Sequence, residues 1–404
     1  MARSLFGYGS TTKAIAKSGG WQIFDDKFIS PSTDEWGNEL LPASAFDPQK
    51  SSLEITSPGI PPSNALTKQA LNLISEYDFY ADTKPFKIWI SGTNGKTTTA
   101  KMTQHLLVQY GSVLGGNVGT PLADLSQNAK IWVLETSSFT IHYSKIAAPE
   151  LYLLLNITKD HESWHGSFEA YEQAKLKPIL SMREGSVAVL PEIYRPFVEK
   201  SSTLAYIIYY KDEFDLAKAA GVDIKSINFK PPFLTDALLA LLSQKILFDK
   251  ADVKLLNSFV IEPHKLEELR DSTDRLWVND TKATNIDASI QALLRYSDKT
   301  IHLILGGDDK GVDMRGLFEF IGDKFSKNIT IYAIGSNSKK LENLSKEYGL
   351  ACHKCDVLDA AVMMIDKSLK AGEVALLSPA AASLDQFSSY AERGDKFKAL
   401  IKSI

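Results

Sequence analysis

The sequence contains few cysteines, no long apolar run and no excess of basic residues. Two cysteines in 404 residues cannot supply a disulfide framework for a chain of this size, which favours the reducing cytoplasm. The longest apolar runs, such as residues 151–155, are far too short to span a bilayer, so no membrane insertion is expected. A formal net charge of −4 argues against a nucleic-acid partner. No apolar segment follows Met1-Ala-Arg-Ser4, and no secretion signal is expected.

The segment that says most about function is a glycine-rich turn, Ser91-Gly-Thr-Asn-Gly-Lys-Thr-Thr98. Residues 86–90 before it are typical of a buried strand, and residues 97–110 after it of a helix. This order presents backbone N–H groups and a helix N-terminus to an anion. Lys96 adds a positive charge for the β- and γ-phosphates, and the hydroxyl of Thr97 suits Mg²⁺. The motif predicts an ATP site, although Ile90 replaces its usual first glycine and a chance lysine beside a glycine turn is the alternative.

The order of strands, helices and turns predicts three α/β segments, at residues 1–84, 85–261 and 262–404. In the first, strands are expected at 4–6, 21–24 and 52–55, with a glycine turn at Gly7 that opens a short helix ending near residues 19–20. Asp25 and Asp26 follow the second strand, where a nucleotide-binding β-α-β unit contacts a ribose. The third glycine of that fingerprint is absent. The later segments alternate strands and helices, as parallel sheets do.

Two expected strands of the middle segment end in polar residues. Strand 131–135 ends at Glu135, and strand 151–156 leads into the loop 158–161. Ligands gather at the carboxyl ends of strands in open α/β sheets, so both should face the glycine-rich turn. Glu135 also stands where proteins with such a loop place an acid that holds Mg²⁺ or its waters. A solvent-facing carboxylate is the alternative.

The segment His161-Glu-Ser-Trp-His165 matches the H-E-x-x-H pattern of zinc proteases. That pattern works when one helix brings both histidines to the same face. Here it follows a strand, and Gly166 comes directly after it, so a long helix is not expected and zinc proteolysis is not favoured. His161 is the better candidate for a metal ligand beside the phosphates, and His165 is as readily a surface residue.

Lys175 lies within an apolar stripe of the helix expected at 168–180. Phe168, Tyr171, Lys175 and Ile179 share one face of that helix. A lysine in such a stripe usually extends its ammonium to the rim. The alternative is a buried, neutral and nucleophilic amine. Pro178 should kink or end the helix.

Three expected strands of the last segment, at 275–279, 300–305 and 373–377, are each followed by polar residues. The segments after them are 279–285, 306–310 and 378–385, and together they predict a second concave site suited to a carboxylate-bearing substrate. A further strand is expected at 328–334, with helices at 338–348, 358–370 and 384–402. Cys352-His-Lys-Cys355 is a lone C-x-x-C without a partner pair, so metal or redox function is not favoured.

These motifs, taken in order, resemble the Mur ligase family. The matching pieces are GTNGKTT at 92–98, GNVGTPL at 116–122, ETSSF at 135–139, NITKDH at 156–161, AKLKPI at 174–179, NDTKATN at 279–285, GGDDKG at 306–311, LLSPAAASLDQF at 376–387 and ERGDKF at 392–397. The last two are similar to the D-glutamate-adding branch.

The resemblance implies three domains: an N-terminal Rossmann-like domain for the nucleotide-sugar precursor (1–84), a central P-loop domain for ATP (85–261) and a C-terminal Rossmann-like domain for the amino acid (262–404). ATP would phosphorylate the carboxylate of UDP-N-acetylmuramoyl-L-alanine, and the amine of D-glutamate would displace phosphate through a tetrahedral intermediate. A cytoplasmic monomer in peptidoglycan synthesis, using ATP, Mg²⁺ and a CO₂-derived carbamate on Lys175, is implied. Domain closure is expected, with a hinge near residues 262–264.

The resemblance also assigns site residues. Catalytic roles fall to Lys96, Glu135, His161 and Lys175, and metal ligation to Thr97, Glu135, His161 and carbamylated Lys175. The ATP-binding residues are Gly92, Thr93, Asn94, Gly95, Lys96, Thr97, Thr98, Asp236, Lys265 and Asp280. The precursor-binding residues are Ser10, Thr11, Asp26, Lys27, Ser57, Asn117, Ser137 and Ser138. The D-glutamate-binding residues are Thr284, Lys310, Ser383, Leu384 and Tyr390.

Some positions depart from the family pattern, and other functions stay open. Thr140 stands where relatives often carry Gln, residues 232–236 lack the usual His-Asn-x-x-Asn signature, and Lys265 replaces a common Arg. The alternatives are another Mur-type or folylpolyglutamate-type ligase, a P-loop ATPase that drives conformational work, and a non-catalytic nucleotide-binding protein. The ATPase would leave the three polar segments of the last domain without a use, and the non-catalytic protein would leave Lys175 and His161 without one.

Overall fold

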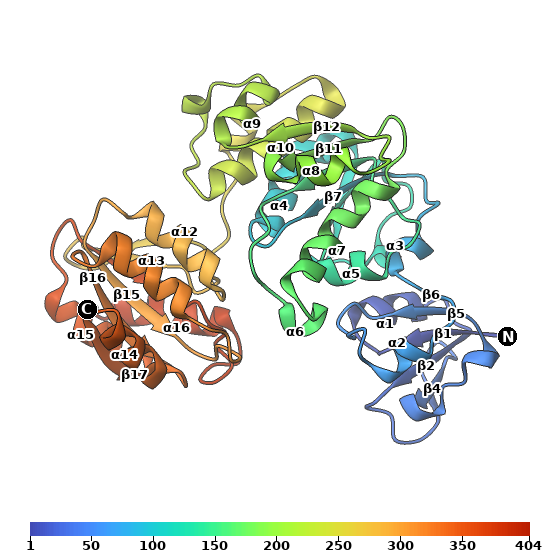
Figure 1. Cartoon of the computed structure of the whole chain (residues 1–404), viewed down its shortest axis with the longest axis horizontal. Helices are drawn as coiled ribbons and strands as arrows, with labels where there is room; N and C mark the ends of the chain where they lie inside the picture. The colour runs from blue at the N-terminus through green and yellow to red at the C-terminus, as the bar shows by residue number, and fades with distance from the viewer. The chain divides into compact units, whose positions relative to one another are not determined.

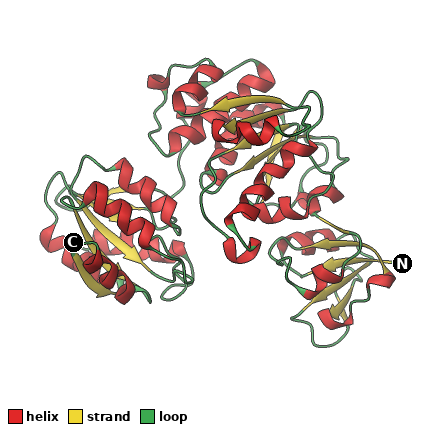
Figure 2. Ribbon diagram, viewed as in Figure 1, coloured by secondary structure: helices red, strands yellow, loops and turns green.

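The computed structural model describes residues 1–404 and contains three six-stranded sheets with their helices (Figures 1 and 2). The chain divides into two compact units. The first comprises Met1–Phe229 with Phe233–Phe259, and the second comprises Lys230–Pro232 with Val260–Ile404. Two of the sheets belong to the first unit and one to the second. The α/β class predicted from the sequence is confirmed. None of the helices combines the length and the apolar character that a bilayer crossing requires.

The N-terminal sheet has the order β3-β4-β2-β1-β5-β6. The three expected strands are present as β1 (Ala2–Phe6), β2 (Trp21–Asp25) and β5 (Ser51–Thr56). Three further strands were not predicted, because they are too short to show alternation of apolar and polar residues. They are β3 (Ser32–Thr33), β4 (Glu39–Pro42) and β6 (Leu73–Ile74). The helices are α1 (Ser10–Ala16), α2 (Ala65–Gln69) and α3 (Glu76–Phe79), so α1 ends before the predicted limit.

The central sheet is entirely parallel, with the order β12-β11-β10-β7-β9-β8. Its strands are β7 (Phe86–Ser91), β8 (Ser112–Gly116), β9 (Ile131–Glu135), β10 (Leu151–Leu154), β11 (Val187–Pro191) and β12 (Tyr206–Tyr210). Because β7 lies between β9 and β10, the turn that follows β7 sits at the middle of the sheet edge. Ligand sites of open parallel sheets form there.

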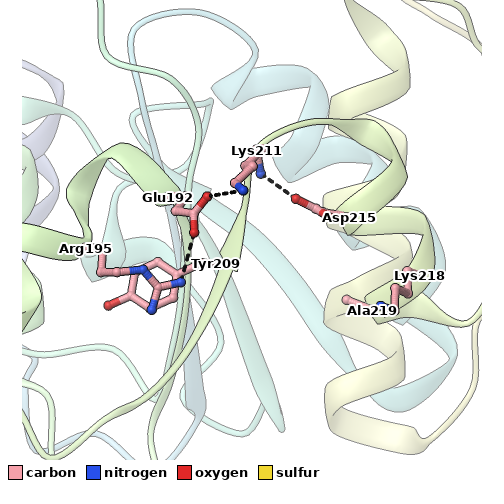
Figure 3. A pocket seen from close by; sticks show the side chains of 7 residues that line it. All are labelled: Glu192, Arg195, Tyr209, Lys211, Asp215, Lys218 and Ala219. Carbon is pink, nitrogen blue, oxygen red and sulfur yellow. Dashed lines mark hydrogen bonds and ion pairs between the residues drawn. The ribbon is translucent and has the colours of Figure 1, made fainter.

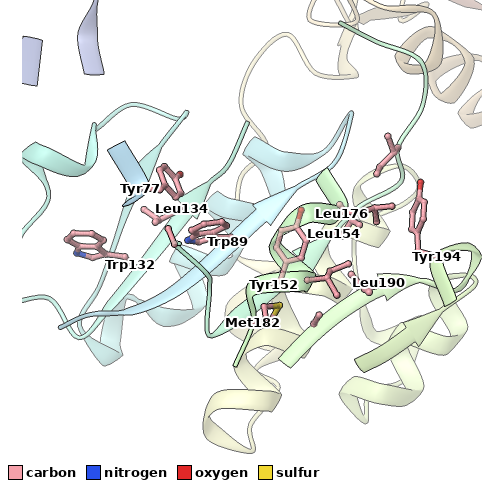
Figure 4. Packing of buried hydrophobic residues seen from close by; sticks show 14 of the residues in the cluster. Tyr77, Trp89, Trp132, Leu134, Tyr152, Leu154, Leu176, Met182, Leu190 and Tyr194 are labelled. Carbon is pink, nitrogen blue, oxygen red and sulfur yellow. The ribbon is translucent and has the colours of Figure 1, made fainter. Parts of the chain in front are cut away.

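The helices of this sheet are α4 (Lys96–Leu107), α5 (Ser138–Tyr143), α6 (Glu162–His165), α7 (Phe168–Ser181), α8 (Arg195–Glu199), α9 (Glu213–Ala220), α10 (Phe233–Phe248) and α11 (Val253–Asn257). One face of the sheet packs large aromatic side chains, including Trp89, Trp132 and Tyr152, against Leu176 and Met182 (Figure 4). This core holds the ends of β7, β9 and β10 at fixed separations.

Helix α7 continues past Pro178 to Ser181, so the prediction that this proline could end the helix is wrong. Proline has no N–H for the helical ladder, so one backbone hydrogen bond is lost. Near this gap the hydroxyl of Tyr152 donates to the carbonyl of Lys175 at 2.6 Å. This hydrogen bond ties α7 to the sheet one residue beyond Ala174, whose carbonyl is the one that Pro178 leaves without its helical donor.

The C-terminal sheet has the order β13-β14-β18-β15-β16-β17, and only β13 is antiparallel to its neighbour. The strands are β13 (Glu267–Arg270), β14 (Leu276–Asn279), β15 (Ile301–Gly306), β16 (Ile329–Ile334), β17 (Cys352–Asp356) and β18 (Val374–Leu377). The helices are α12 (Ile286–Arg295), α13 (Arg315–Phe325), α14 (Ser338–Glu347), α15 (Leu358–Ser368) and α16 (Tyr390–Lys402).

Two details of this sheet differ from the sequence reading. Helix α16 begins at Tyr390 rather than Leu384, because Ser389 caps it by accepting the N–H of Glu392, and the preceding residues form a turn on the carbonyl of Ser383. The C-x-x-C segment is strand β17, which was not expected. Its two cysteines are three residues apart, so they point to opposite faces of the strand, and both are free thiols.

Candidate active site

The glycine-rich turn joins β7 to α4 and is held by the end of β10. Gly92 has φ 142°, and a Cβ there would lie 2.6 Å from Cβ of Leu155, so a larger residue could not fit. Gly95, at φ 86°, caps α4 in the left-handed conformation. The hydroxyl of Thr93 donates to the carbonyl of Thr158 at 3.1 Å and accepts its N–H at 2.9 Å. The loop 158–161 therefore contacts the turn, as predicted.

Two lysines converge on one backbone carbonyl of the turn. Nζ of Lys96 donates to the carbonyls of Gly92 at 2.9 Å and Thr93 at 2.7 Å. Nζ of Lys175 donates to the same Gly92 carbonyl at 2.8 Å and lies 3.3 Å from the hydroxyl of Ser91. The turn thus gathers two lysine side chains at the place where a polyphosphate would bring negative charge.

Lys175 is 1% exposed, so the reading in which it extends to solvent is wrong. Burial holds the pKa of its amine well below the ordinary lysine value, and the positive charge of Lys96 lowers it further. The ring of Tyr171, one turn earlier on α7, lies 4.8 Å from Nζ. An amine of this kind loses its proton readily and can then act as a nucleophile.

Glu135, at the carboxyl end of β9, faces the start of α4. Its carboxylate accepts the hydroxyl of Thr97 at 2.7 Å and the side-chain amide of Asn117 at 2.6 Å. The carboxylate is buried, yet these neutral donors satisfy both of its oxygens. A hydroxyl and a carboxylate in contact form an oxygen donor set of the kind that Mg²⁺ prefers. The fold contains no cluster of three or more acidic, histidine or cysteine side chains that would hold a metal by itself.

The structure places Asp236 behind the turn. It belongs to α10, is buried, and accepts the hydroxyl of Thr99 at 2.9 Å. A Cβ on Gly95 would collide with its carboxylate. Thr98, also in the first turn of α4, is buried as well, whereas Asn94 is partly exposed. Asp236 therefore supports the first turn of α4 from α10.

His161 and His165 have different environments. His161 precedes α6 with φ 52°, and its side chain is about half exposed. Helix α6 has only four residues and does not include His161, so the arrangement that zinc proteases require is absent. Nε2 of His165 lies 3.0 Å from the hydroxyl of Ser138. Burial, followed by the charges of neighbouring side chains, lowers the pKa of His165 to about 4.

The contact of His165 with Ser138 was not expected from the sequence, which left His165 as readily a surface residue. Ser137, the neighbouring precursor candidate, caps α5 and bonds with Thr140 at 3.0 Å. The order of residues gave no signal for the His165 contact, because it joins two segments far apart in the chain. Both serines and Asn117 nevertheless follow the ends of β8 and β9, next to the glycine-rich turn.

In the N-terminal sheet, the predicted precursor residues lie along the loops after β1, β2 and β5. Ser10, Asp26 and Lys27 are exposed, and Thr11 and Ser57 are partly exposed. The turn at Gly7 approaches Ser57 closely.

The acid engaged beside this turn is Asp25 rather than Asp26. The Asp25 carboxylate accepts the N–H of Tyr8 at 2.7 Å and the N–H of Lys27 at 2.9 Å. The sequence predicted an acid at the end of this strand. The predicted length of the strand could not decide whether Asp25 or Asp26 takes that position.

The three polar segments of the C-terminal sheet form one continuous edge. Asp308 and Ala382 exchange backbone hydrogen bonds of 2.9 Å, and Ala380 donates to the carbonyl of Ala283 at 3.0 Å. The predicted D-glutamate residues lie along this edge, with Thr284, Lys310, Leu384 and Tyr390 exposed and Ser383 buried. Lys282 places its ammonium 4.0 Å from the ring of Tyr390.

Two predicted adenine or ribose contacts are already engaged within the second unit. Asp280 accepts the hydroxyl of Ser378 at 2.8 Å and the N–H of Leu266 at 3.2 Å. Because it is fully buried, its pKa is raised to about 7. Lys265 pairs with Glu262 at 2.9 Å, and its side chain is only 14% exposed.

Arg393 is a buried cation that the sequence reading did not single out. Its guanidinium donates to the hydroxyl and the carbonyl of Thr281, at 2.8 and 3.0 Å, and to the carbonyl of Ala381 at 3.1 Å. Burial lowers its pKa to about 10. Arg393 thereby joins the segment after β14 to the segment after β18. Only its place in the ERGDKF motif could have drawn attention to it.

A surface hollow on the central sheet involves none of the predicted site residues. Glu192, Arg195, Tyr209, Lys211, Asp215, Lys218 and Ala219 line it (Figure 3). Glu192 pairs with both Arg195 and Lys211, each at 3.1 Å, so these two cations already share a carboxylate within the hollow.

The chain resembles proteins of one family along its whole length. A family described as the Mur ligase middle domain matches residues 90–225. The UDP-N-acetylmuramoylalanine--D-glutamate ligase of Campylobacter jejuni subsp. jejuni serotype O:23/36 (strain 81-176) is 54% identical over 409 residues, covering 100% of both chains. The protein of the same name from Helicobacter pylori (strain ATCC 700392 / 26695) is 43% identical, covering 99% of each chain.

Solved structures show the same fold at low sequence identity. MurF from Acinetobacter baumannii has a TM-score of 0.64 and 14% identity, covering 96% of this chain and 86% of its own. MurF ligase from Thermotoga maritima in complex with ADP has a TM-score of 0.59 and 17% identity, covering 87% and 88%. These likenesses support the three-domain α/β architecture.

Proposed function

The chain belongs to the Mur ligase family, within the group of UDP-N-acetylmuramoylalanine--D-glutamate ligases, and from that premise we propose how its residues perform the reaction. The enzyme is an ATP-dependent ligase that joins D-glutamate to UDP-N-acetylmuramoyl-L-alanine in peptidoglycan synthesis. The residue roles rest on one observation. The chain combines a phosphate-binding turn, with Lys96, Glu135 and Lys175 around it, and a second polar edge that contains Lys310.

The first step activates a carboxylate, which is a poor electrophile at neutral pH. An oxygen of the alanyl carboxylate attacks the γ-phosphorus of ATP, the bond to the β-phosphate oxygen breaks, and an acyl phosphate and ADP form. The N–H groups at the start of α4 and the ammonium of Lys96 hold the phosphate oxygens while negative charge moves between them. Exchanging its hydrogen bonds to Gly92 and Thr93 for the phosphates would bring Lys96 into this role.

Glu135 and Thr97 offer the oxygen atoms that Mg²⁺ binding needs, so the residues present fit this ion. When bound, Mg²⁺ supplies positive charge that reduces repulsion between the carboxylate and the triphosphate. Asn117 keeps the Glu135 carboxylate oriented toward Thr97. His161, beside the loop that contacts Thr93, is the proposed ligand of a second ion.

We infer that Lys175 serves as a carbamate. Its neutral amine nitrogen would attack the carbon of CO₂ and lose a proton, which would convert a potential cation into an anion with two oxygen donors. Burial, the low pKa and the nearby positive charge of Lys96 all favour this change. The carbamate oxygens would then join His161 in holding the second ion.

The second step forms the amide bond. The neutral amine of D-glutamate attacks the acyl carbon, a tetrahedral intermediate forms, and the carbon–oxygen bond to phosphate breaks while the nitrogen loses its proton. We propose that Lys310, Thr284 and Ser383 bind the two carboxylates of D-glutamate, with Leu384 and Tyr390 beside them. The proposed precursor contacts are Ser10, Thr11, Asp26, Lys27, Ser57, Asn117, Ser137 and Ser138. Cytoplasmic location and the monomeric state stay predictions.

A coupled assay of ADP release tests the substrate assignment. With UDP-N-acetylmuramoyl-L-alanine present, D-glutamate should give sustained turnover, whereas L-lysine, diaminopimelate and L-glutamate should not. Replacing the precursor by a folate should abolish turnover. Turnover with L-lysine and none with D-glutamate would show that the chain works on another substrate pair, and ADP release without any amino acid would favour a P-loop ATPase.

A further inference from the structure

The loop that carries Lys310 is held from the side by the end of a neighbouring strand. This loop comprises residues 306–312, and the segment after β16, Gly335-Ser336-Asn337, contacts it. The side-chain oxygen of Asn337 accepts the N–H of Gly307 at 3.0 Å. The hydroxyl of Ser336 donates to the carbonyl of the same glycine at 3.1 Å. Gly307 has φ 143°, a conformation that few other residues adopt, so this contact fixes an unusual turn.

The same neighbouring segment contacts the third polar loop of the C-terminal sheet. The N–H of Ser336 donates to the carboxylate of Asp385 at 2.7 Å. Asp385 lies beside Ser383 and Leu384, which are proposed D-glutamate contacts. The end of β16 therefore holds two loops of the proposed amino-acid site, although it contains none of the residues that the sequence assigned to that site.

Asp309, directly before Lys310, is the centre of a charged network. One oxygen of its carboxylate accepts the N–H of Gly311 at 2.9 Å. The other accepts the side-chain amide of Asn337 at 3.2 Å and the ammonium of Lys340 at 2.8 Å. Lys340 also donates to the carbonyl of Val312 at 2.6 Å, so it bridges two points of the loop. Although burial opposes the effect, these contacts hold the pKa of Asp309 below its usual value.

This network settles which lysine neutralises Asp309. The ion pair of Asp309 is with Lys340, on α14, and not with Lys310, its neighbour in sequence. Lys310 has φ 50° and is exposed. The left-handed backbone turns the chain at this residue, while the N–H of Lys310 bonds to Asp308 at 3.0 Å. The positive charge of Lys310 is thus left for a ligand, and the negative charge of Asp309 is compensated elsewhere.

We propose that Asn337 and Lys340 are positioning residues for D-glutamate. They fix the loop 306–312 and neutralise Asp309, which lets Lys310 attract a dicarboxylate. This inference rests on the proposed function, because Lys310 must be a D-glutamate contact. Loss of Lys340 would free the carboxylate of Asp309 next to the incoming dianion, and repulsion between them would weaken binding. The effect should fall on D-glutamate and spare ATP, whose phosphate loop belongs to the other unit.

The test is a double-mutant cycle in the full-length protein. KM for each substrate is measured for the wild type, Lys340→Ala, Asp309→Asn and the double variant. Lys340→Ala should raise KM for D-glutamate about fivefold and leave KM for ATP unchanged, the size expected of a partly exposed pair within a network. Adding Asp309→Asn should recover part of that loss, because the freed negative charge is removed. Lys340→Arg should remain close to wild type, since it keeps the charge and the donors.

Lys339→Ala is the matched control, because Lys339 is the preceding residue of α14 and pairs only with Glu342, at 2.7 Å. It removes the same charge from the same helix and should leave KM for D-glutamate unchanged. An equal rise of the KM for D-glutamate in Lys340→Ala and Lys339→Ala would contradict the proposal. An unchanged KM in Lys340→Ala would contradict it as well.

Asn337→Ala is a second route to the same question. It leaves the N–H of Gly307 without its partner and should raise KM for D-glutamate about tenfold. If this variant does not fold, the Lys340 cycle alone decides the question. Wild-type protein that forms no product with D-glutamate would overturn the proposed function itself, whereas an active wild type with insensitive Lys340 variants would overturn only the present inference.

Discussion

Two glycine-rich turns in this molecule look alike in sequence and differ in charge. The turn 91–97 and the turn 306–311 each follow a parallel strand, and each contains a lysine. In the first, Lys96 and Lys175 bond to backbone carbonyls. In the second, Asp308 and Asp309 directly precede the exposed Lys310, and Lys340 compensates Asp309. In the proposed mechanism, Lys96 of the first turn binds a polyphosphate beside the buried amine of Lys175, whereas Lys310 of the second turn offers one exposed cation to a small dicarboxylate.

Burial, more than residue type, decides what each of these lysines can do. Lys175 is excluded from water and its pKa falls, so its neutral form becomes available for chemistry. Lys310 is exposed and can hold its charge as an electrostatic contact. In the proposed mechanism Lys96 must stay charged, whereas Lys175 must lose its proton. The two lysines nevertheless donate to the same carbonyl, that of Gly92.

The largest expected effect comes from removing the charge of Lys96. Lys96→Ala should lower kcat by about 100-fold or more, because a fixed positive charge is lost where negative charge moves in the transition state. Steady-state assays at saturating substrates measure this directly. Wild-type kcat in a folded Lys96→Ala enzyme would contradict the assignment of the turn to phosphate binding.

A pair of lysine-to-arginine substitutions distinguishes the role of Lys175 from that of Lys310. Lys310→Arg should raise KM for D-glutamate by no more than about threefold, because the charge remains and only its geometry changes. Lys175→Arg should lower kcat about as much as Lys175→Ala, since a guanidinium neither deprotonates nor forms a carbamate. Acetate or formate should restore part of the activity of Lys175→Ala and none of that of Lys175→Arg. Similar losses of activity in Lys175→Arg and Lys310→Arg would contradict the proposal that only Lys175 must lose its proton.

The smallest expected effect is on stability. The unfolded chain protonates Lys175 up to its ordinary pKa of 10.5, and the folded chain holds that pKa well below this value. Unfolding therefore takes up a proton in this window, so unmodified Lys175 lowers stability at neutral pH. Lys175→Met should raise the Tm at pH 7, in CO₂-free buffer, by about 2 °C.

The gain from Lys175→Met should shrink as the pH rises toward 10.5, the ordinary pKa of lysine. Lys310→Met is the control and should leave the Tm unchanged, because Lys310 is exposed. A Tm that falls in Lys175→Met at neutral pH would show that the hydrogen bonds of Nζ outweigh the cost of burying it.

Much of the central site could be predicted from the sequence because its geometry is local. The glycine-rich turn, the end of β9 and the apolar face of α7 each follow from spacing within one element. The contacts of His165 with Ser138, of Arg393 with Thr281 and of Asn337 with Gly307 join distant segments, and no local pattern encodes them. The start of α16 was misplaced for a related reason, since a tertiary turn at Ser383 competes with the helix.

Carbon-13 NMR of the wild-type enzyme equilibrated with ¹³CO₂ reads the chemical state of Lys175 itself. With ATP and UDP-N-acetylmuramoyl-L-alanine bound, we expect one protein carbamate resonance that is absent from Lys175→Ala and retained in Lys310→Ala. An enzyme that is fully active without such a resonance, or a resonance that persists in Lys175→Ala, would contradict the conclusion that burial prepares this lysine for carbamylation.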